Sequence, residues 1–358
     1  MPQSKSAREL ASYARVPRSG FQESAILIPP EACGLLRTPG ATEEVLGSSR
    51  ALTGVFFGRP YVSGRAMGAE GFPLTHVSEK GLDERRPFAG AYLHVIEDVI
   101  VRTVEFDGRV VGTCFEDDEA VYCYLSGIRT DDITLSREAQ TKRLFEILEE
   151  SLARASMDFH DVVRTWYFID DILDWYEEFN ATRSAFFTAR GVFDRLVPAS
   201  TGIGGGNPHG AAVVADAFAV KPKTDEVGVR AVPSPLQCPA LEYGSSFSRA
   251  VELTVSDHRR LLVSGTASIS PDGETMHRGD CAAQIDLTMR VVGAILESRG
   301  MAWSAVTRSV AYFKERDHMG EFAACCAARG IESLPVISVH NDVCRDDLLF
   351  EIEVDAVV

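Results

Sequence analysis

The sequence has no excess of basic residues. Its 358 residues include 52 Asp and Glu against 36 Lys and Arg, which gives a formal net charge of -16 at pH 7. Nucleic acids and anionic membrane surfaces bind to basic protein faces, so this balance argues against both as partners. An anionic small molecule is still compatible with it, because a few arginines in a cleft reverse the potential locally.

Long apolar runs and cysteine motifs are missing as well. No run approaches the ~20 apolar residues of a membrane-spanning helix, and the N-terminal stretch lacks the apolar core of a signal peptide. The eight cysteines contain no Cys-x-x-Cys pair, so the sequence implies neither a zinc motif nor a disulfide framework. We therefore expect a cytoplasmic protein without a metal site, whose cysteines are mostly reduced core thiols.

What is present is an ordinary globular composition, with 45% hydrophobic and 25% charged residues, in a chain long enough for two or three domains. Residues 1–87 are rich in glycine and proline, poorly periodic, and indicate no function. Regular strand and helix patterns begin at residue 88. Prolines between Lys221 and Pro239 predict a linker around residue 225, which separates a first domain, 88–225, from a second domain, 226–358.

The two periodic domains repeat one another. Their offset of about 140 residues is too long for a solenoid and is typical of a duplicated domain. Each copy groups strands ahead of and around two helices, which predicts the α+β class. Three short motifs recur: Leu125-Ser-Gly as Val263-Ser-Gly, Val163-Arg-Thr-Trp-Tyr-Phe as Thr307-Arg-Ser-Val-Ala-Tyr-Phe, and Ala189-Arg-Gly as Ala328-Arg-Gly.

The end of the second copy alternates with period two. Apolar residues at positions 348, 350, 352 and 354 take one face, and Glu351 and Glu353 take the other, which predicts a half-buried strand. Two glutamates on one strand face indicate either a solvated edge or a pair of carboxylates in a cleft. In a cleft, burial and the second negative charge would raise the pKa of one glutamate toward neutrality.

Several motifs resemble the YjgF/RidA family. The second copy carries Ser264-Gly-Thr-Ala-Ser-Ile-Ser-Pro-Asp-Gly, Ala282-Ala-Gln and the closing Phe350-Glu-Ile-Glu, and the first copy carries Phe179-Asn-Ala-Thr-Arg-Ser-Ala-Phe-Phe and Pro198-Ala-Ser-Thr. Two such copies behind an N-terminal extension, with Trp175-Tyr-x-x-Phe-Asn-x-x-Arg and Tyr243-Gly-Ser-Ser-Phe-Ser-Arg-Ala, are similar to the chorismatases. Those enzymes remove pyruvate from chorismate without a metal or cofactor.

The resemblance implies a fold and an assembly. Each copy would be a YjgF/RidA-like (chorismate-mutase-like) domain, a mixed sheet packed by two helices. By analogy with trimeric relatives, the two copies and the N-terminal region would form an internal pseudo-trimer within a monomer. The active site would lie where the sheet of the second copy meets a neighbouring module. The implied activity is release of pyruvate and a hydroxybenzoate from chorismate, for secondary metabolism.

Cleavage of the enol-pyruvyl ether of chorismate requires a proton on its methylene carbon. The resemblance assigns this general-acid role to Glu351; the alternative is a surface glutamate. The two carboxylates of the substrate require arginines, whose planar guanidinium matches a carboxylate. Tyr176, Asn180 and Arg183 fall at i, i+4 and i+7, on one stripe of a predicted helix.

The resemblance suggests Tyr176, Arg183, Tyr243 and Arg249 as substrate contacts. Arg249 is expected on the first strand of the second copy. For Arg183 the alternative is an ion pair on the helix surface, for example with Glu178. Weaker candidates are Tyr122, Arg129, Arg164 and Arg308, since an arginine that flanks a strand is more often structural.

Residues 197–208 are predicted to form a glycine-rich loop. The stretch lacks the Gly-Lys-[Ser/Thr] ending of a P-loop, so phosphate binding is not expected. Its glycines would instead let backbone N–H groups approach a carboxylate, which makes Ser200, Thr201 and Gly202 candidate substrate contacts. Simple RidA proteins carry an arginine at the position of Ser200, and neither copy has it, which disfavours imine hydrolysis.

Cys344 lies seven residues before Glu351. Among chorismatases, the residue at this place separates enzymes that release a dihydroxy-cyclohexadiene acid from those that release a hydroxybenzoate, and a cysteine resembles the 3-hydroxybenzoate type. The alternative for Cys344 is a buried structural thiol. The alternatives for the function are a chorismatase that gives the diene acid or 4-hydroxybenzoate, a RidA-like imine or enamine hydrolase, and a non-catalytic small-ligand sensor.

Overall fold

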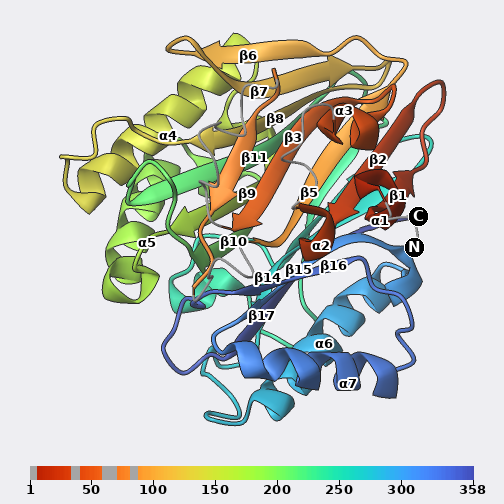
Figure 1. Ribbon diagram of the computed structural model, residues 1–358. Helices are drawn as coiled ribbons and strands as arrows, with labels where there is room; N and C mark the ends of the chain where they lie inside the picture. The colour runs from red at the N-terminus through yellow and green to blue at the C-terminus, as the bar shows by residue number, and fades with distance from the viewer. Residues whose placement is uncertain (1–5, 34–40, 59–70, 81–87) are drawn as a thin grey trace.

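Three sheets with the same strand plan build the molecule (Figure 1). The computed structural model describes residues 6–33, 41–58, 71–80 and 88–358, and within these each sheet belongs to one module, N-terminal, middle or C-terminal. In each sheet the last strand of the module lies in the interior and pairs antiparallel with one member of a parallel edge pair. The repeated α+β fold expected from the sequence is confirmed.

The N-terminal module has the strand order β1-β2-β5-β3-β4. Its strands are β1 (Ser12–Val16), β2 (Gln22–Ile28), β3 (Arg50–Gly58), β4 (Leu74–Val77) and β5 (Phe88–Glu97), and its helices are α1 (Ala7–Leu10), α2 (Pro30–Cys33) and α3 (Ala41–Leu46). The sequence placed residue 88 at the start of the next domain. However, β5 pairs with β2 and β3 and so completes the N-terminal sheet. A run of successive strand patterns does not reveal which sheet each strand joins.

The middle module has the order β6-β7-β8-β11-β9-β10. Its elements are β6 (Arg102–Phe106), β7 (Arg109–Glu116), β8 (Ala120–Ile128), α4 (Arg137–Arg154), β9 (Val162–Ile169), α5 (Ile172–Ala189), β10 (Ala199–Gly204) and β11 (Val213–Pro222). In α4, Leu144, Leu148 and Leu152 are buried at helical spacing. Ser136 caps this helix, because its Oγ accepts a hydrogen bond from the Ala139 backbone N–H at 3.2 Å.

The glycine-rich stretch is not a loop throughout. Ala199–Gly204 forms β10, which pairs in parallel with β9, so the prediction of a loop over residues 197–208 is wrong for this part. Glycine has a low strand propensity and suggests a turn when read alone. Pairing with β9, which is buried along its whole length, overrides that local preference.

The C-terminal module has the order β12-β13-β14-β17-β15-β16. Its elements are β12 (Gly228–Val232), β13 (Ala250–Thr254), β14 (Arg259–Ala267), α6 (Cys281–Ser298), β15 (Val306–Phe313), α7 (Met319–Ala328), β16 (Val336–His340) and β17 (Phe350–Val357). The expected linker, Lys221 to Pro239, therefore contains β12 in its middle. Arg249 precedes β13, the second strand of this module, rather than lying on the first strand.

The alternation at the end of the chain forms β17. Phe350, Ile352 and Val354 pack into the cluster beneath α6 and α7, which leaves Glu351 and Glu353 on the opposite face of the sheet. Leu348 precedes the strand and belongs to the central cluster instead, so the strand begins two residues later than the sequence predicted.

The inner faces of the three sheets meet in a central cluster. Phe57, Phe168 and Tyr312 occupy corresponding positions on β3, β9 and β15, and the ring of Phe57 lies 6.3 Å from that of Phe168 and 6.2 Å from that of Tyr312. These three rings mark a pseudo-threefold axis. Helices α4 and α5 cover the outside of the middle sheet, and α6 and α7 cover the outside of the C-terminal sheet (Figure 1).

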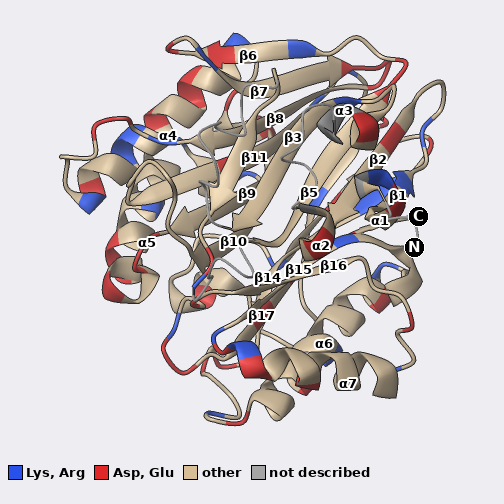
Figure 2. Cartoon of the chain, in the orientation of Figure 1, with Lys and Arg blue, Asp and Glu red and all other residues tan. Residues whose placement is uncertain are grey.

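Charged residues lie mainly away from that centre. In Figure 2, blue basic and red acidic residues mark α4 and several loops, while the strands in the middle of the view are mostly tan. Among the described residues, no helix is both long enough and apolar enough to cross a membrane.

Candidate active site

A pocket opens between β10 and α5 of the middle module and β14 and β17 of the C-terminal module. Edge strand β10 contacts the C-terminal module directly, because the Ser200 backbone N–H donates to Ser264 Oγ at 2.8 Å. The pocket is lined by Tyr176, Arg183, Ser200, Gly202, Tyr243, Ser245, Phe247, Arg249, Gly265, Ala267, Ile269, Cys344, Arg345, Leu348 and Glu351.

The structure brings together all the main catalytic and substrate-contact candidates from the sequence except Thr201. Thr201 is not among the lining residues, and its hydroxyl group donates to Glu353 instead. Sequence reasoning gave no role to seven lining residues: Ser245, Phe247, Gly265, Ala267, Ile269, Arg345 and Leu348. The first five lie within motifs that it had quoted, and Leu348 belongs to the alternating stretch at the end of the chain. Arg345 directly follows Cys344, and its guanidinium lies 5.5 Å from the Tyr243 ring. A place in or next to these motifs was the available signal.

Glu351 is held almost out of water on the inner face of β17, with 4% of its surface exposed. Burial, followed by the negative charge of Glu353, raises the pKa of the Glu351 carboxyl to about 8, against the opposing effects of Arg164 and Arg249. The carboxyl group is therefore protonated at neutral pH. This protonation state is the one a general acid requires.

Gly265 makes room for that carboxyl group. A Cβ atom at this position would run into Glu351 Oε1 and lie 3.2 Å from Thr201 Cγ2. The glycine of the repeated Ser-Gly motif is thus required on the C-terminal strand by the close approach of an acidic side chain.

Glu353 lies two residues further along β17 and is fully buried. Its carboxylate pairs with Arg164 Nη2 at 2.8 Å and with Arg308, and it accepts a hydrogen bond from Thr201 Oγ1 at 2.5 Å. Arg164 and Arg308, weaker candidates for substrate contact, therefore hold this glutamate as a fixed negative charge. That charge is shielded from solvent, and it helps to raise the pKa of the neighbouring Glu351 carboxyl group.

Two pocket arginines have no acidic partner. Among the described residues, no carboxylate lies within ion-pair distance of Arg183 or Arg249, although both are at least 96% buried. Arg183 Nη2 donates to Asn180 Oδ1 at 2.6 Å, and Arg249 Nε donates to the Cys238 carbonyl at 2.9 Å. Arg183 Nε and Arg249 Nη2 are buried without a hydrogen-bond partner. The expected alternative for Arg183, a surface ion pair with Glu178, is absent.

Aromatic rings and a thiol complete the pocket. The Tyr243 ring lies 5.3 Å from the Arg249 guanidinium, and the Tyr176 ring stacks on Phe179 at 6.1 Å. Burial raises the pKa of Tyr176, and raises the pKa of the Cys344 thiol to about 12 with help from Glu351. Cys344 is consequently a neutral thiol at neutral pH, suited to shaping the pocket or donating weakly rather than to nucleophilic attack.

The other two module interfaces lack the acid. On β17, Glu351 stands opposite Tyr312; the corresponding partners of Phe168 and Phe57 are Val214 and Gly90. The supporting contacts persist between the N-terminal and middle modules, where Thr75 Oγ1 donates to Asp216 Oδ1 at 2.5 Å as Thr201 does to Glu353. The threonine–carboxylate contact is thus repeated at a second interface, while the position of Glu351 is acidic at one interface only among these three matched positions.

The remaining weak candidates lie outside the pocket. Tyr122 packs in the central cluster, where its hydroxyl accepts a hydrogen bond from Arg18 at 3.4 Å. Arg129 forms an ion pair with Asp131 at 3.5 Å.

Comparison with known proteins finds a solved structure with the same fold and relatives with similar sequences. No family model matches the chain. Its fold is that of a chorismatase crystal structure, with a TM-score of 0.67 at 18% identity, covering 96% of this chain and 99% of that chain. In sequence it is 30% identical over 221 residues to a chorismatase of Streptomyces rapamycinicus, which covers 55% of this chain and 64% of the relative. It is also 27% identical over 269 residues to a 3-hydroxybenzoate synthase of Streptomyces hygroscopicus, which covers 67% and 75%.

The chain is therefore a homologue of the chorismatases and shares their fold, which confirms the resemblance drawn from its motifs. It spans less than two thirds of the Streptomyces rapamycinicus chorismatase and of a Streptomyces hygroscopicus chorismatase, 64% and 62% of their lengths.

Proposed function

We propose that the chain is a chorismatase that cleaves the enol-pyruvyl ether of chorismate to pyruvate and 3-hydroxybenzoate without a metal or cofactor. The observation that carries this proposal is a buried, protonated Glu351 in a pocket whose arginines have no acidic partner. A neutral acid beside unpaired cations suits a dianionic substrate that must be protonated on carbon.

Arg183 and Arg249 are the proposed partners of the two substrate carboxylates. A guanidinium stays charged when it is desolvated and binds a carboxylate through two parallel hydrogen bonds. In this arrangement the substrate would satisfy Arg183 Nε and Arg249 Nη2, two buried nitrogen atoms of the pocket-lining arginines that have no hydrogen-bond partner within the described residues. Ser200, Gly202, Tyr176 and Tyr243 would surround the ring.

Glu351 is the proposed general acid. It delivers its proton to the methylene carbon of the enol-pyruvyl group, and the ether carbon becomes oxocarbenium-like. The ring hydroxyl then gives its proton to the Glu351 carboxylate, and its oxygen displaces the ether oxygen from the neighbouring ring carbon. The bond between that carbon and the ether oxygen breaks, and the pyruvyl group leaves as pyruvate. Opening of the resulting ring epoxide and loss of a ring proton give 3-hydroxybenzoate. The two products together contain all the atoms of chorismate, so no water is consumed.

Two observations support the 3-hydroxybenzoate product. A 3-hydroxybenzoate synthase is among the relatives, and the match covers 75% of its length. Cys344 lines the pocket beside Glu351, where a neutral thiol fills space that an attacking water molecule would otherwise occupy. Exclusion of water favours attack by the substrate's own hydroxyl.

Incubation with chorismate tests the proposal. Pyruvate is followed with a coupled assay, and the second product is identified by chromatography and its ultraviolet spectrum. Equal amounts of pyruvate and 3-hydroxybenzoate are expected. A dihydroxy-cyclohexadiene acid or 4-hydroxybenzoate would change the product assignment alone. Binding without turnover would instead indicate a sensor, and turnover of dehydro-amino acids an imine hydrolase.

The proposal extends to assembly and location. We propose that a single chain, with its three modules, is the working unit and that it acts in the cytoplasm in secondary metabolism. The expected mass in light scattering is that of one 39.1 kDa chain. A stable larger species would contradict the monomer.

A further inference from the structure

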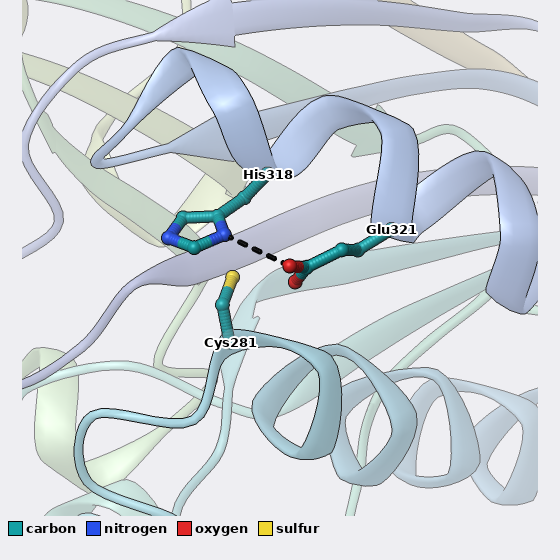
Figure 3. Close-up of side chains that lie close together, drawn as sticks. All are labelled: Cys281, His318 and Glu321. Carbon is teal, nitrogen blue, oxygen red and sulfur yellow. Dashed lines mark ion pairs between the residues drawn. The ribbon is translucent and has the colours of Figure 1, made fainter.

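A second cluster of reactive side chains lies on the outer side of the C-terminal sheet, across β17 from Glu351. Figure 3 shows Cys281 at the start of α6 pointing toward His318 and Glu321 at the start of α7. One potential metal-binding atom from each residue lies within 4.8 Å of the other two. The sequence predicted no metal site, because the two helix ends that meet here are far apart in the chain.

We propose that Cys281, His318 and Glu321 bind a zinc ion that clamps the N-terminal ends of α6 and α7. Sulfur, imidazole nitrogen and carboxylate oxygen are the donors that zinc accepts in proteins. Two ligands of a tetrahedral zinc ion lie roughly 3.3–3.7 Å apart, given metal–ligand distances of about 2.0–2.3 Å. His318 Nδ1 and Glu321 Oε1 are already 3.3 Å apart.

The cluster combines one buried residue with two partly exposed residues, an arrangement that suits a metal site. Cys281 is 3% exposed, and Glu321 Oε2 is shielded without a hydrogen-bond partner. The side chains of His318 and Glu321 as a whole keep 28% and 41% of their surface exposed, which gives an ion a route in and leaves room for water as a fourth ligand. Zinc binds cysteine as the thiolate, so metal binding would release the proton of the Cys281 thiol.

The middle module offers an internal comparison. Arg137 is the first residue of α4, as Cys281 is of α6, and a glutamine follows three residues later in both helices. Arg137 lies 3.4 Å from Asp171 and 3.8 Å from Asp174, so a cation joins the ends of α4 and α5. The C-terminal module has a thiol at the matching position, where the middle module has the guanidinium. A bound metal ion would restore the positive charge between the paired helices.

The cluster is connected to the segment that leads to Glu351. Gln284 follows Cys281 by one helical turn, and its Nε2 donates to the Asp347 carbonyl at 2.9 Å. Its Oε1 accepts a hydrogen bond from the Leu349 backbone N–H at 2.8 Å. A metal ion that holds the start of α6 in place would therefore restrict the motion of the segment between Cys344 and Glu351. The zinc proposal itself is independent of chorismate cleavage.

Metal titration of the untagged full chain tests the site. The protein is stripped with a chelator under reducing conditions and titrated first with Co²⁺, whose bond to a thiolate gives a charge-transfer band in the near ultraviolet, and then with Zn²⁺ in competition. One equivalent of Co²⁺ should bind with this band, and Zn²⁺ should remove it. Cys281→Ala should abolish the band and weaken zinc binding by more than ~100-fold, since loss of supporting residues alone costs about 10–100-fold.

Two further variants complete the design. His318→Ala changes a partly exposed side chain, should remain folded, and should weaken zinc binding while keeping the thiolate band. Cys326→Ala removes another buried thiol, on α7 but outside the cluster, and should bind zinc like the unmodified chain. Zinc should raise the Tm of the unmodified protein and of Cys326→Ala only. A missing thiolate band at one equivalent of Co²⁺, or equal zinc affinity in Cys281→Ala, would overturn the proposal.

Discussion

Glu351 and Glu353 project from the same face of β17, yet of these two only Glu353 forms an ion pair within the described part of the chain. Arg164 and Arg308 form ion pairs with Glu353 in a fully buried position. Glu351 has no such partner in the described residues, and burial raises the pKa of its carboxyl group to about 8, so it keeps its proton at neutral pH. Two glutamates on one strand face thus have different electrostatic surroundings.

Replacing the acid should stop the reaction without unfolding the protein. Glu351→Gln keeps the shape and neutrality of the protonated side chain but has no acidic proton, so pyruvate release should fall by about 10²–10⁴-fold. The coupled pyruvate assay measures the rate, and thermal melting reports the fold. Glu332→Gln, at an exposed position of the same module, is the matched control. Full activity in Glu351→Gln would remove the proposed mechanism.

Activity should decline on the alkaline side. Because the pKa of Glu351 is raised from 4.5 to about 8, the acid is protonated below pH 8, and kcat/KM should fall tenfold per pH unit above it. The folded state also binds this proton more tightly than the unfolded state. Its contribution to stability is therefore complete below about pH 4.5 and is lost as the pH rises through 8.

The stability effect is best measured as a difference between variants. Asp216, outside the pocket, also has a pKa raised by burial, to about 7, and titrates in the same range. Denaturant unfolding of the unmodified chain and of Glu351→Gln between pH 5 and pH 9 isolates the part due to Glu351. For activity, a kcat/KM value that stays constant up to pH 10 would contradict the assignment of Glu351 as the general acid.

Removing the fixed charge should change both stability and the pH profile. Glu353→Gln leaves the buried Arg164 guanidinium without an ion-pair partner in the described part of the chain, while Arg308 keeps Asp355 at 3.2 Å. The expected cost is about 3–5 kcal/mol in the free energy of unfolding. Loss of the neighbouring negative charge should lower the pKa of Glu351 and move the alkaline limb of kcat/KM to lower pH. Urea unfolding and a pH–rate profile measure the two effects. An unshifted limb would show that Glu353 does not tune the acid.

The carboxylate-binding role of Arg183 can be separated from its charge. Arg183→Lys keeps a positive charge but loses the planar fork, so KM for chorismate should rise roughly 10–100-fold, about 1.4–2.7 kcal/mol of binding free energy. Steady-state kinetics measure KM and kcat. Arg190→Lys, at the C-terminal cap of the same helix, 41% exposed and paired with Glu149, should leave KM unchanged. Equal KM values in both variants would exclude Arg183 from substrate binding.

Cys344 should affect the outcome of the reaction more than its speed. In Cys344→Ala the pocket gains space next to Glu351, and water can compete with the ring hydroxyl. The ratio of 3-hydroxybenzoate to the dihydroxy-diene acid should fall while chorismate consumption changes less. Chromatography of both products after complete conversion measures the ratio, and an unchanged ratio would leave Cys344 with a structural role only.

Hydrophobic periodicity within short stretches of the sequence was enough to predict β17 and α5. The period-two alternation of β17 identified its two faces, and helical spacing placed Tyr176, Asn180 and Arg183 on α5. The pocket itself followed from the family resemblance, since no local pattern indicates that α5 and β17 face one another.

Non-local pairing accounts for what the sequence did not reveal. The sequence of β5 is compatible with pairing in either the N-terminal or the middle sheet, so it does not reveal which one the strand joins. The sequence of β10 is glycine-rich, and this segment becomes a strand through its pairing with β9. The zinc ligands proposed on α6 and α7 are brought together by packing of the two helices on the same sheet. Each of these depends on which distant segment a stretch meets, which its own composition does not encode.

The three-module architecture has a consequence for how such a protein can change. In a trimer of identical subunits, one substitution alters every interface at once. Here the three interfaces are encoded separately, so the positions that match Glu351 can differ, and they are Val214 and Gly90. A substitution at one of these positions therefore changes one interface and leaves the residues of the other two as they are.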